Sequence, residues 1–147
     1  MREITADEAP ALRECLESLA AHHNAVSTNF KGDYPSRRYD DTLAIFSEAL
    51  RSGRSRAAIA EEGGKIAGFC KIDAAPDGCG KLDYLVVLAE FRGRGHGTAL
   101  MDWAMQTFCA LGVSRIEVKV ADGNAAALRF YEKYGFRMNA HILVRLG

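Results

Sequence analysis

The stretch that decides the fold runs from Leu82 to Leu100 and reads LDYLVVLAEFRGRGHGTAL. Its apolar run, 85–88, is typical of a buried strand. A glycine-rich turn follows at 92–97, and an amphipathic helix begins at about Thr98. A strand that leads through glycines into a helix can bind anions, because glycine accepts positive φ and the first amides of a helix have no partner within it. We therefore expect a phosphate-bearing ligand at this turn.

Two familiar phosphate-binding loops fit this turn poorly. The P-loop carries Lys followed by Ser or Thr after its last glycine, whereas Gly97 is followed by Thr98 and Ala99. The dinucleotide loop has a third glycine where this chain has Thr98, and it belongs to an early strand–helix unit. A nucleotide-binding protein that uses residues 92–97 is therefore the weaker interpretation.

A second motif further along the chain narrows the choice. The run NAAALRFYEKYGF begins at Asn124 and ends at Phe136. It resembles the later signature of the GNAT superfamily, the acyl-CoA-dependent N-acetyltransferases, which reads Asn-x-x-Ala-x-x-x-Tyr-x-x-x-Gly-Phe. The earlier Arg92-x-x-Gly95-x-Gly97 resembles the diphosphate loop of the same superfamily. Both motifs lie in the second half of the chain, and the first half shows only a compatible order of elements.

The bulk composition predicts a single domain over residues 1–147, because 48% of the residues are hydrophobic and 26% are charged. The formal net charge is zero, which argues against a nucleic-acid partner. The sequence shows no apolar run long enough for a membrane span and no signal peptide, so we expect a cytoplasmic protein without a membrane partner. The four cysteines have no Cys-x-x-Cys spacing and are expected to be reduced thiols, with no metal.

Hydrophobic periodicity and turn residues predict the order β-α-α-β-β-β-α-β-α-β. The predicted strands are 2–5, 55–62, 65–74, 81–88, 115–120 and 137–146, and the predicted helices are 7–23, 40–51, 96–111 and 124–134. The fold class is α/β of mixed type, a mostly antiparallel sheet with helices on both faces. This is also the GNAT order. The resemblance implies that the strands at 82–88 and 115–120 splay apart and that the pantetheine arm of coenzyme A lies in the gap.

The resemblance also implies which residues bind acetyl-CoA, the expected co-substrate. The diphosphate is expected on the backbone amides of the turn, and the side chains of Arg92 and Arg94 add positive charge. Val87, and less strongly Leu85, provide strand backbone beside the thioester, and Asn124 binds the pantetheine arm. The full predicted set is Leu85, Val87, Arg92, Gly93, Arg94, Gly95, His96, Gly97, Thr98, Asn124 and Tyr131.

Two residues are predicted to be catalytic. Tyr131 matches the family tyrosine that protonates the departing thiolate, and a phenol is protonated at neutral pH. Asp83 lies on the strand before the loop, where many members carry an acidic residue that accepts the proton of the amine. Glu117 on the next strand and the pair at 22–23 are other candidates for the base, since a histidine ordinarily titrates near pH 6.5. A water chain without a dedicated base is a further alternative.

The acceptor is expected to bind between residues 22–38 and the strand near Asp83. The predicted acceptor-binding residues are His22, His23, Asn24, Phe30, Tyr34 and Asp83. The sequence therefore predicts an enzyme that transfers an acetyl group from acetyl-CoA to an amine of a small molecule or a peptide, by direct attack in a ternary complex. The alternative is a module of the same fold that binds acyl-CoA as a sensor without turnover. The final strand is a candidate for pairing across a two-fold axis in a homodimer.

Overall fold

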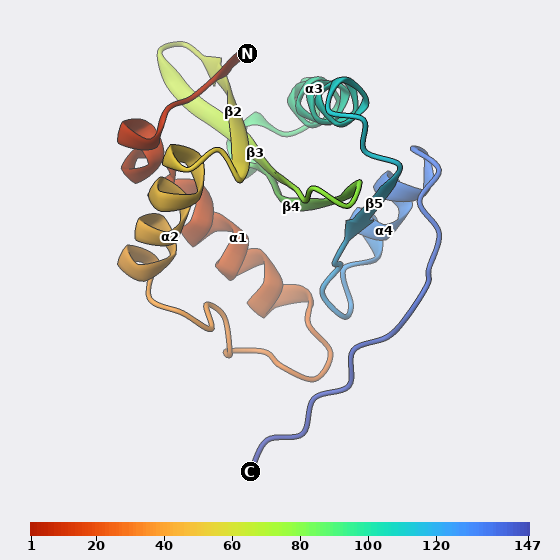
Figure 1. The fold of residues 1–147 in the computed structure, drawn as a ribbon. Coiled ribbons are helices and arrows are strands. Elements are labelled where there is room, and N and C mark those ends of the chain that lie inside the picture. Colours follow the sequence, from red (N-terminus) through yellow and green to blue (C-terminus); the bar gives the residue numbers. More distant parts are fainter.

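The computed structural model describes residues 1–147 as a five-stranded sheet with helices packed on both faces (Figure 1). The strands follow one another across the sheet in sequence order. They are β1 (Arg2–Glu3), β2 (Ser55–Glu62), β3 (Lys65–Ala74), β4 (Cys79–Val87) and β5 (Arg115–Val118). The helices are η1 (Ala6–Leu12), α1 (Arg13–Val26), α2 (Tyr39–Arg51), η2 (Ala89–Phe91), α3 (His96–Ala110) and α4 (Ala125–Glu132).

Strands β1 to β4 are antiparallel, and only β5 joins the sheet in parallel, after the crossover through α3. The β2–β3 hairpin has the predicted bounds, since Gly63 and Gly64 both take the positive φ that its two-residue turn requires. A bulge interrupts the β3–β4 ladder: Lys71 pairs with Tyr84 and Ile72 pairs with Leu82. Asp83 is therefore the extra residue of β4.

The sheet separates two apolar cores. On one face, α1 and α2 pack on side chains such as Phe69 and Val86. On the other face, α3 and α4 pack on Cys70, Ile72 and Leu82. Successive residues of β3 alternate between the two cores, as the two-residue period of a strand requires. The predicted class, a mostly antiparallel mixed sheet covered on both faces, is confirmed.

The first helical segment differs from the prediction at both ends. Residues 6–12 form a 3-10 helix that contains Pro10, and its N-cap is Thr5. The following helix α1 continues to Val26 rather than ending at residue 23, so Asn24 lies on its last turns with His22 and His23. Leu12 and Leu16 are both buried against the sheet.

The predicted strand at 137–146 does not form. Residues after Phe136 have no regular secondary structure and extend away from the body of the protein (Figure 1). Their apolar side chains are exposed, with Leu143 at 93% and Ile142 at 69%. An alternating apolar pattern specifies a strand only where a neighbouring strand provides hydrogen-bond partners, and here no ladder reaches beyond β5. The expected homodimer depended on this strand and stays a prediction.

Candidate functional site

The site begins where β4 and β5 separate. The parallel ladder joins Cys79–Leu82 to Arg115–Val118 and ends there, although β4 continues to Val87. On the other edge of β4, the Leu88 amide donates to the Ala67 carbonyl at 2.8 Å. Since alternate residues of a strand direct their backbone groups to opposite edges, Leu85 and Val87 direct theirs toward the side that β5 has left. Beyond Leu82, this edge of β4 therefore has no paired strand, as the predicted separation of the two strands requires.

The glycine-rich turn follows directly after this free edge. Gly93 and Gly95 have φ values of 75° and 86°, a conformation that costs little only for glycine. Gly95 is the N-cap of α3, and the first hydrogen bond within this helix runs from the Ala99 amide to the Gly95 carbonyl at 3.0 Å. The amides of residues 96–98 therefore have no partner inside the helix, and the helix dipole places partial positive charge beside them.

A pocket of about 250 Å³ opens on these amides. Seven predicted cofactor residues line it: Val87, Arg92, Gly93, Gly95, His96, Gly97 and Thr98. Two aromatic residues that the sequence reasoning did not select, Phe91 and Phe130, complete the lining. Four predicted members, Leu85, Arg94, Asn124 and Tyr131, are not part of it. This combination of free amides and apolar walls suits an anionic group attached to an organic body.

Three side chains of the turn are held by hydrogen bonds to Glu62 and Val87. Glu62, at the end of β2, accepts from Arg94 Nη1 at 2.8 Å and lies 3.0 Å from His96 Nε2. The hydrogen bond from His96, followed by that from Arg94, lowers the pKa of Glu62. Arg92 Nε donates to the Val87 carbonyl at 3.2 Å. The two arginines therefore brace the turn.

Asn124 and Tyr131 both belong to helix α4 and its N-cap. Asn124 is the N-cap, and its side chain accepts from the Ala127 amide at 3.4 Å. Tyr131 lies two turns later, is 8% exposed and packs edge-on against Phe130 and Phe136. Burial raises the pKa of Tyr131 to about 12. The hydroxyl therefore remains a proton donor across the neutral pH range.

The predicted acceptor residues gather at the end of α1. His22 Nε2 lies 3.3 Å from Asn124 Oδ1, and the His23 ring lies 5.0 Å from the ring of Tyr34. Asn24 Oδ1 accepts from the Tyr34 amide at 3.0 Å, which folds the following loop back on the helix. Burial, and then the neighbouring His22, lower the pKa of His23. Phe30 joins the same loop through a hydrogen bond from its amide to Ser27 Oγ.

Asp122, which the sequence reasoning missed, connects this loop to the β5–α4 turn. Its carboxylate accepts from Ser27 Oγ at 2.8 Å and from the amides of Thr28 and Asn29. These hydrogen bonds, led by that from Ser27, lower the pKa of Asp122. A side chain on the adjacent Gly123 would overlap the carbonyl oxygen of Val26. The end of α1 and the start of α4 thus form one closely packed unit.

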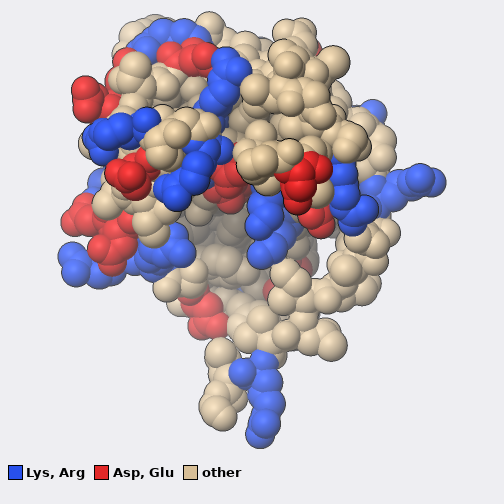
Figure 2. Space-filling model, in the orientation of Figure 1, with Lys and Arg blue, Asp and Glu red and all other residues tan.

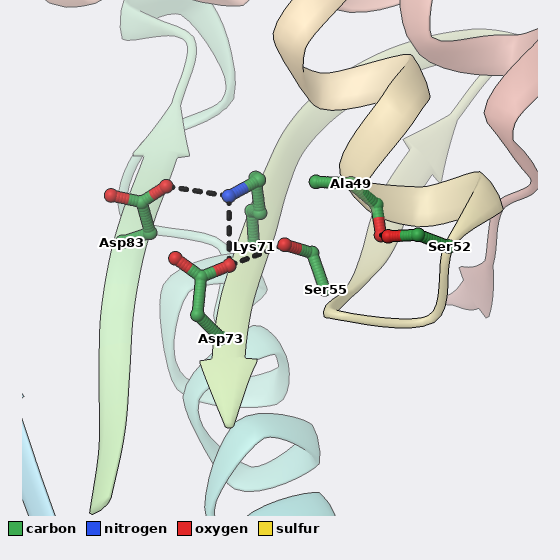
Figure 3. Close-up of polar contacts among 6 residues, drawn as sticks. All are labelled: Ala49, Ser52, Ser55, Lys71, Asp73 and Asp83. Carbon is green, nitrogen blue, oxygen red and sulfur yellow. Dashed lines mark hydrogen bonds and ion pairs between the residues drawn. The ribbon is translucent and has the colours of Figure 1, made fainter. Parts of the chain in front are cut away.

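Asp83 lies apart from that group, in a charged cluster on the α2 side of the sheet (Figure 3). Lys71 Nζ donates to Asp83 Oδ2 at 2.6 Å and to Asp73 Oδ1 at 2.9 Å, and it lies 4.9 Å from the centre of the Phe46 ring. Ser55 Oγ donates to the same oxygen of Asp73. The lysine side chain is 4% exposed, whereas the two carboxylates are about one-third exposed, at 36% and 34%. Sequence reasoning missed Lys71, although it shares a strand face with the buried Phe69.

The surface between α1 and β5 is recessed. Figure 2, in the orientation of Figure 1, shows a hollow there with a mostly uncharged floor and side chains of both signs around it. The view contains no extended basic surface of the kind that phosphate backbones require. None of the helices combines the length and the apolar character needed to cross a membrane.

A mixed sheet with a free strand edge beside a helix N-terminus is an arrangement suited to an extended ligand with an anionic end. The model of the Acetyltransferase (GNAT) family matches residues 19–136, and the chain belongs to this family.

Relatives agree with this assignment. An uncharacterised N-acetyltransferase of Mycobacterium bovis is 33% identical over 104 residues, a match that covers 71% of this chain and 67% of that one. A mycothiol acetyltransferase of Thermomonospora curvata is 43% identical over 67 residues, and this match covers 44% of the chain and only 23% of that protein's length. Among solved structures, the PaiA N-acetyltransferase from Thermoplasma acidophilum in complex with coenzyme A has a TM-score of 0.76 at 17% identity, covering 95% of this chain and 92% of that one.

Proposed function

We propose that this protein transfers the acetyl group of acetyl-CoA to an amine by direct attack within a ternary complex. One observation carries the proposal: the free edge of β4, where pairing with β5 stops at Leu82, leads directly into the pocket lined by the turn at 92–98. An extended ligand with an anionic end fits this arrangement, because one part can pair with the strand while the other binds the helix N-terminus. The relatives named N-acetyltransferase support the same reaction.

The residues fit the diphosphate of coenzyme A. The unpaired amides of His96, Gly97 and Thr98 provide donors, and the positive φ values of Gly93 and Gly95 allow the backbone to approach the ligand closely. The Glu62 carboxylate already engages Arg94 and His96, so we assign the main contribution to backbone amides. Phe91 and Phe130 provide apolar contact beside them.

The backbone at Leu85 and Val87 lies on the gap side of β4 and is proposed to hold the pantetheine arm and the thioester. When the amine attacks the carbonyl carbon, the C–S bond breaks and negative charge passes to sulfur. We assign Tyr131 as the donor to that sulfur. Because the pKa of this phenol is about 12 and that of an ordinary thiol is about 8.5, it stabilises the thiolate first as a hydrogen-bond donor.

Asp83 stays the proposed base, or the group that first binds the acceptor's ammonium. The ion pair with Lys71 favours the second role, because a proton on Asp83 would weaken the neutralisation of a buried lysine. The carboxylate is one-third exposed, at 34%, so one face is open to a ligand. We propose that the acceptor lies between this carboxylate and the loop at 27–38, with His22, His23, Asn24, Phe30 and Tyr34 along the far side.

The proposed acceptors are amines of small molecules or of peptides. The experiment is a panel of both kinds, with release of free thiol from acetyl-CoA as the signal and mass spectrometry of the product. Amine-dependent thiol release and an acetylated product support the proposal. A protein that binds acetyl-CoA and releases no thiol with any amine would instead be the acyl-CoA sensor, the second candidate, and one that does not bind it would contradict both.

A further inference from the structure

The side-chain amide of Asn124 has a defined orientation. The Ala127 amide lies 3.4 Å from Asn124 Oδ1 in the N-cap arrangement of α4. A backbone N–H can only donate, so the atom that faces it must be the oxygen of the side chain and not its nitrogen. The Nδ2 group, with its two hydrogens, is therefore turned the other way.

His22 completes the environment of that oxygen. His22 Nε2 lies 3.3 Å from Asn124 Oδ1. Because the oxygen can only accept, Nε2 must carry a hydrogen, and the histidine donates whether its ring is neutral or protonated. Ala127 and His22 together occupy both lone pairs of Oδ1. The Nδ2 hydrogens of Asn124 are then the ones that can donate to a ligand.

The unit that carries both residues has little freedom to rearrange. Asp122 holds the end of α1 through Ser27 and two loop amides, and the space at Gly123 excludes any side chain. His22 is half-buried, and Asn124 is 9% exposed. The hydrogen bond between them thus spans two elements whose relative position is fixed by other contacts.

We propose that His22 is a positioning residue for the acyl-CoA site: its Nε2–H fixes Asn124 Oδ1, so that Asn124 Nδ2 donates to a carbonyl of the amide-containing arm of the cofactor. This inference rests on the proposed function. It assigns to the acceptor-side helix α1 a part in holding the cofactor. It also distinguishes His22 from its neighbour His23, which packs on Tyr34 instead.

Three substitutions test whether binding needs a donor at the position of Nε2 or only a polar side chain at residue 22. In His22→Gln the amide nitrogen reaches the position of the imidazole Nε2 and keeps the donor. In His22→Asn the amide nitrogen lies closer to the backbone, at the position of Nδ1, and does not reach Asn124 Oδ1. His22→Ala removes the group entirely. His23→Ala is the matched control for changes to the end of α1.

The experiment is calorimetry with coenzyme A and, separately, with adenosine 3′,5′-diphosphate, which lacks the arm. We expect His22→Ala and His22→Asn to weaken coenzyme A binding about fivefold, the value of one net hydrogen bond. His22→Gln and His23→Ala should bind coenzyme A with an affinity within about twofold of that of the wild type. All four variants should bind adenosine 3′,5′-diphosphate with the affinity of the wild type.

Each other outcome has a definite meaning. If the wild type does not bind coenzyme A, the proposed function itself fails. If the wild type binds it and His22→Ala binds it equally well, the positioning role is wrong. An equal loss for both ligands, or a failure of His22→Gln to restore what His22→Asn loses, would show a general structural effect and would also overturn the inference.

Discussion

Gly95 allows the anion-binding role of the turn to be tested with a matched pair of substitutions. It is the N-cap of α3 with a φ of 86°, and a Cβ built there meets no atom within 4 Å. Asn and Asp therefore fit the space equally well, both tolerate the left-handed conformation better than other side chains, and both are good N-caps. Gly95→Asn and Gly95→Asp thus form a matched pair that differs by one negative charge.

The expected magnitude follows from Coulomb's law. Two unit charges about 5 Å apart interact by roughly 1 kcal/mol in water and by about 3 kcal/mol at an effective dielectric constant of 20. A diphosphate carries at least one such charge near the turn. Gly95→Asp should therefore bind coenzyme A about 10- to 100-fold more weakly than Gly95→Asn, by roughly 1.4 to 3 kcal/mol.

Stability should change in the opposite direction. A carboxylate at a helix N-terminus stabilises the helix by about 0.3 to 1 kcal/mol relative to a neutral side chain, so Gly95→Asp should unfold at equal or higher urea than Gly95→Asn. Calorimetry at two salt concentrations provides the assay, and the difference in affinity should shrink at the higher one because salt screens the repulsion. Equal affinities of the two variants for coenzyme A would refute the placement of the diphosphate at this turn.

Three further predictions concern Tyr131, the buried thiol of Cys70 and Lys71. Tyr131→Phe should lower kcat by about 10²-fold, the lower end for a positioned acid, while coenzyme A affinity measured by calorimetry stays unchanged; an unaltered kcat would remove the assigned role. Burial raises the pKa of Cys70 from 9.0 to about 12. The native state therefore keeps the thiol proton that the unfolded state loses, and the free energy of unfolding falls as pH rises from 9 to 12, by on the order of 4 kcal/mol in total. Urea midpoints should fall steeply over this range and less steeply in Cys70→Ala; identical slopes would contradict this assignment. Lys71→Met should lower the free energy of unfolding by about 2 kcal/mol, below the usual 3–5 for a fully buried pair, because its partner carboxylates are one-third exposed at 36% and 34%. No change in the urea midpoint of that variant would show that the cluster adds nothing to stability.

Local chemistry in the sequence was enough to predict most of the fold. The Gly63–Gly64 turn determined the β2–β3 hairpin to the residue, and the glycines at 93 and 95 located the start of α3. Both signals are conformational, since only glycine takes positive φ at little cost, and they depend on no distant contact. The predicted strand at 137–146 does not form. Its prediction depended on the alternation of apolar and polar side chains, whereas a strand also needs a hydrogen-bonded neighbour.

The site was predictable where it is built from backbone and less so where it depends on tertiary contacts. The pocket-lining residues from Arg92 to Thr98 follow one another in the chain, so one motif identified nearly all of them. Asp122 and Lys71 bind partners from other elements, and nothing in the sequence around Asp122 marks it as more than a surface charge. Lys71 did leave one signal: the two-residue period of β3 places it on the face of the buried Phe69.

The central claim is that the amides at the start of α3 bind the diphosphate of coenzyme A. The most direct measurement is an NMR titration of the ¹⁵N-labelled protein with coenzyme A and, in parallel, with pantetheine, which lacks the phosphates. The account predicts that coenzyme A shifts the amide signals of Gly95, His96, Gly97 and Thr98 and that pantetheine leaves them in place. Coenzyme A binding that shifts other amides and leaves these four unmoved would contradict it.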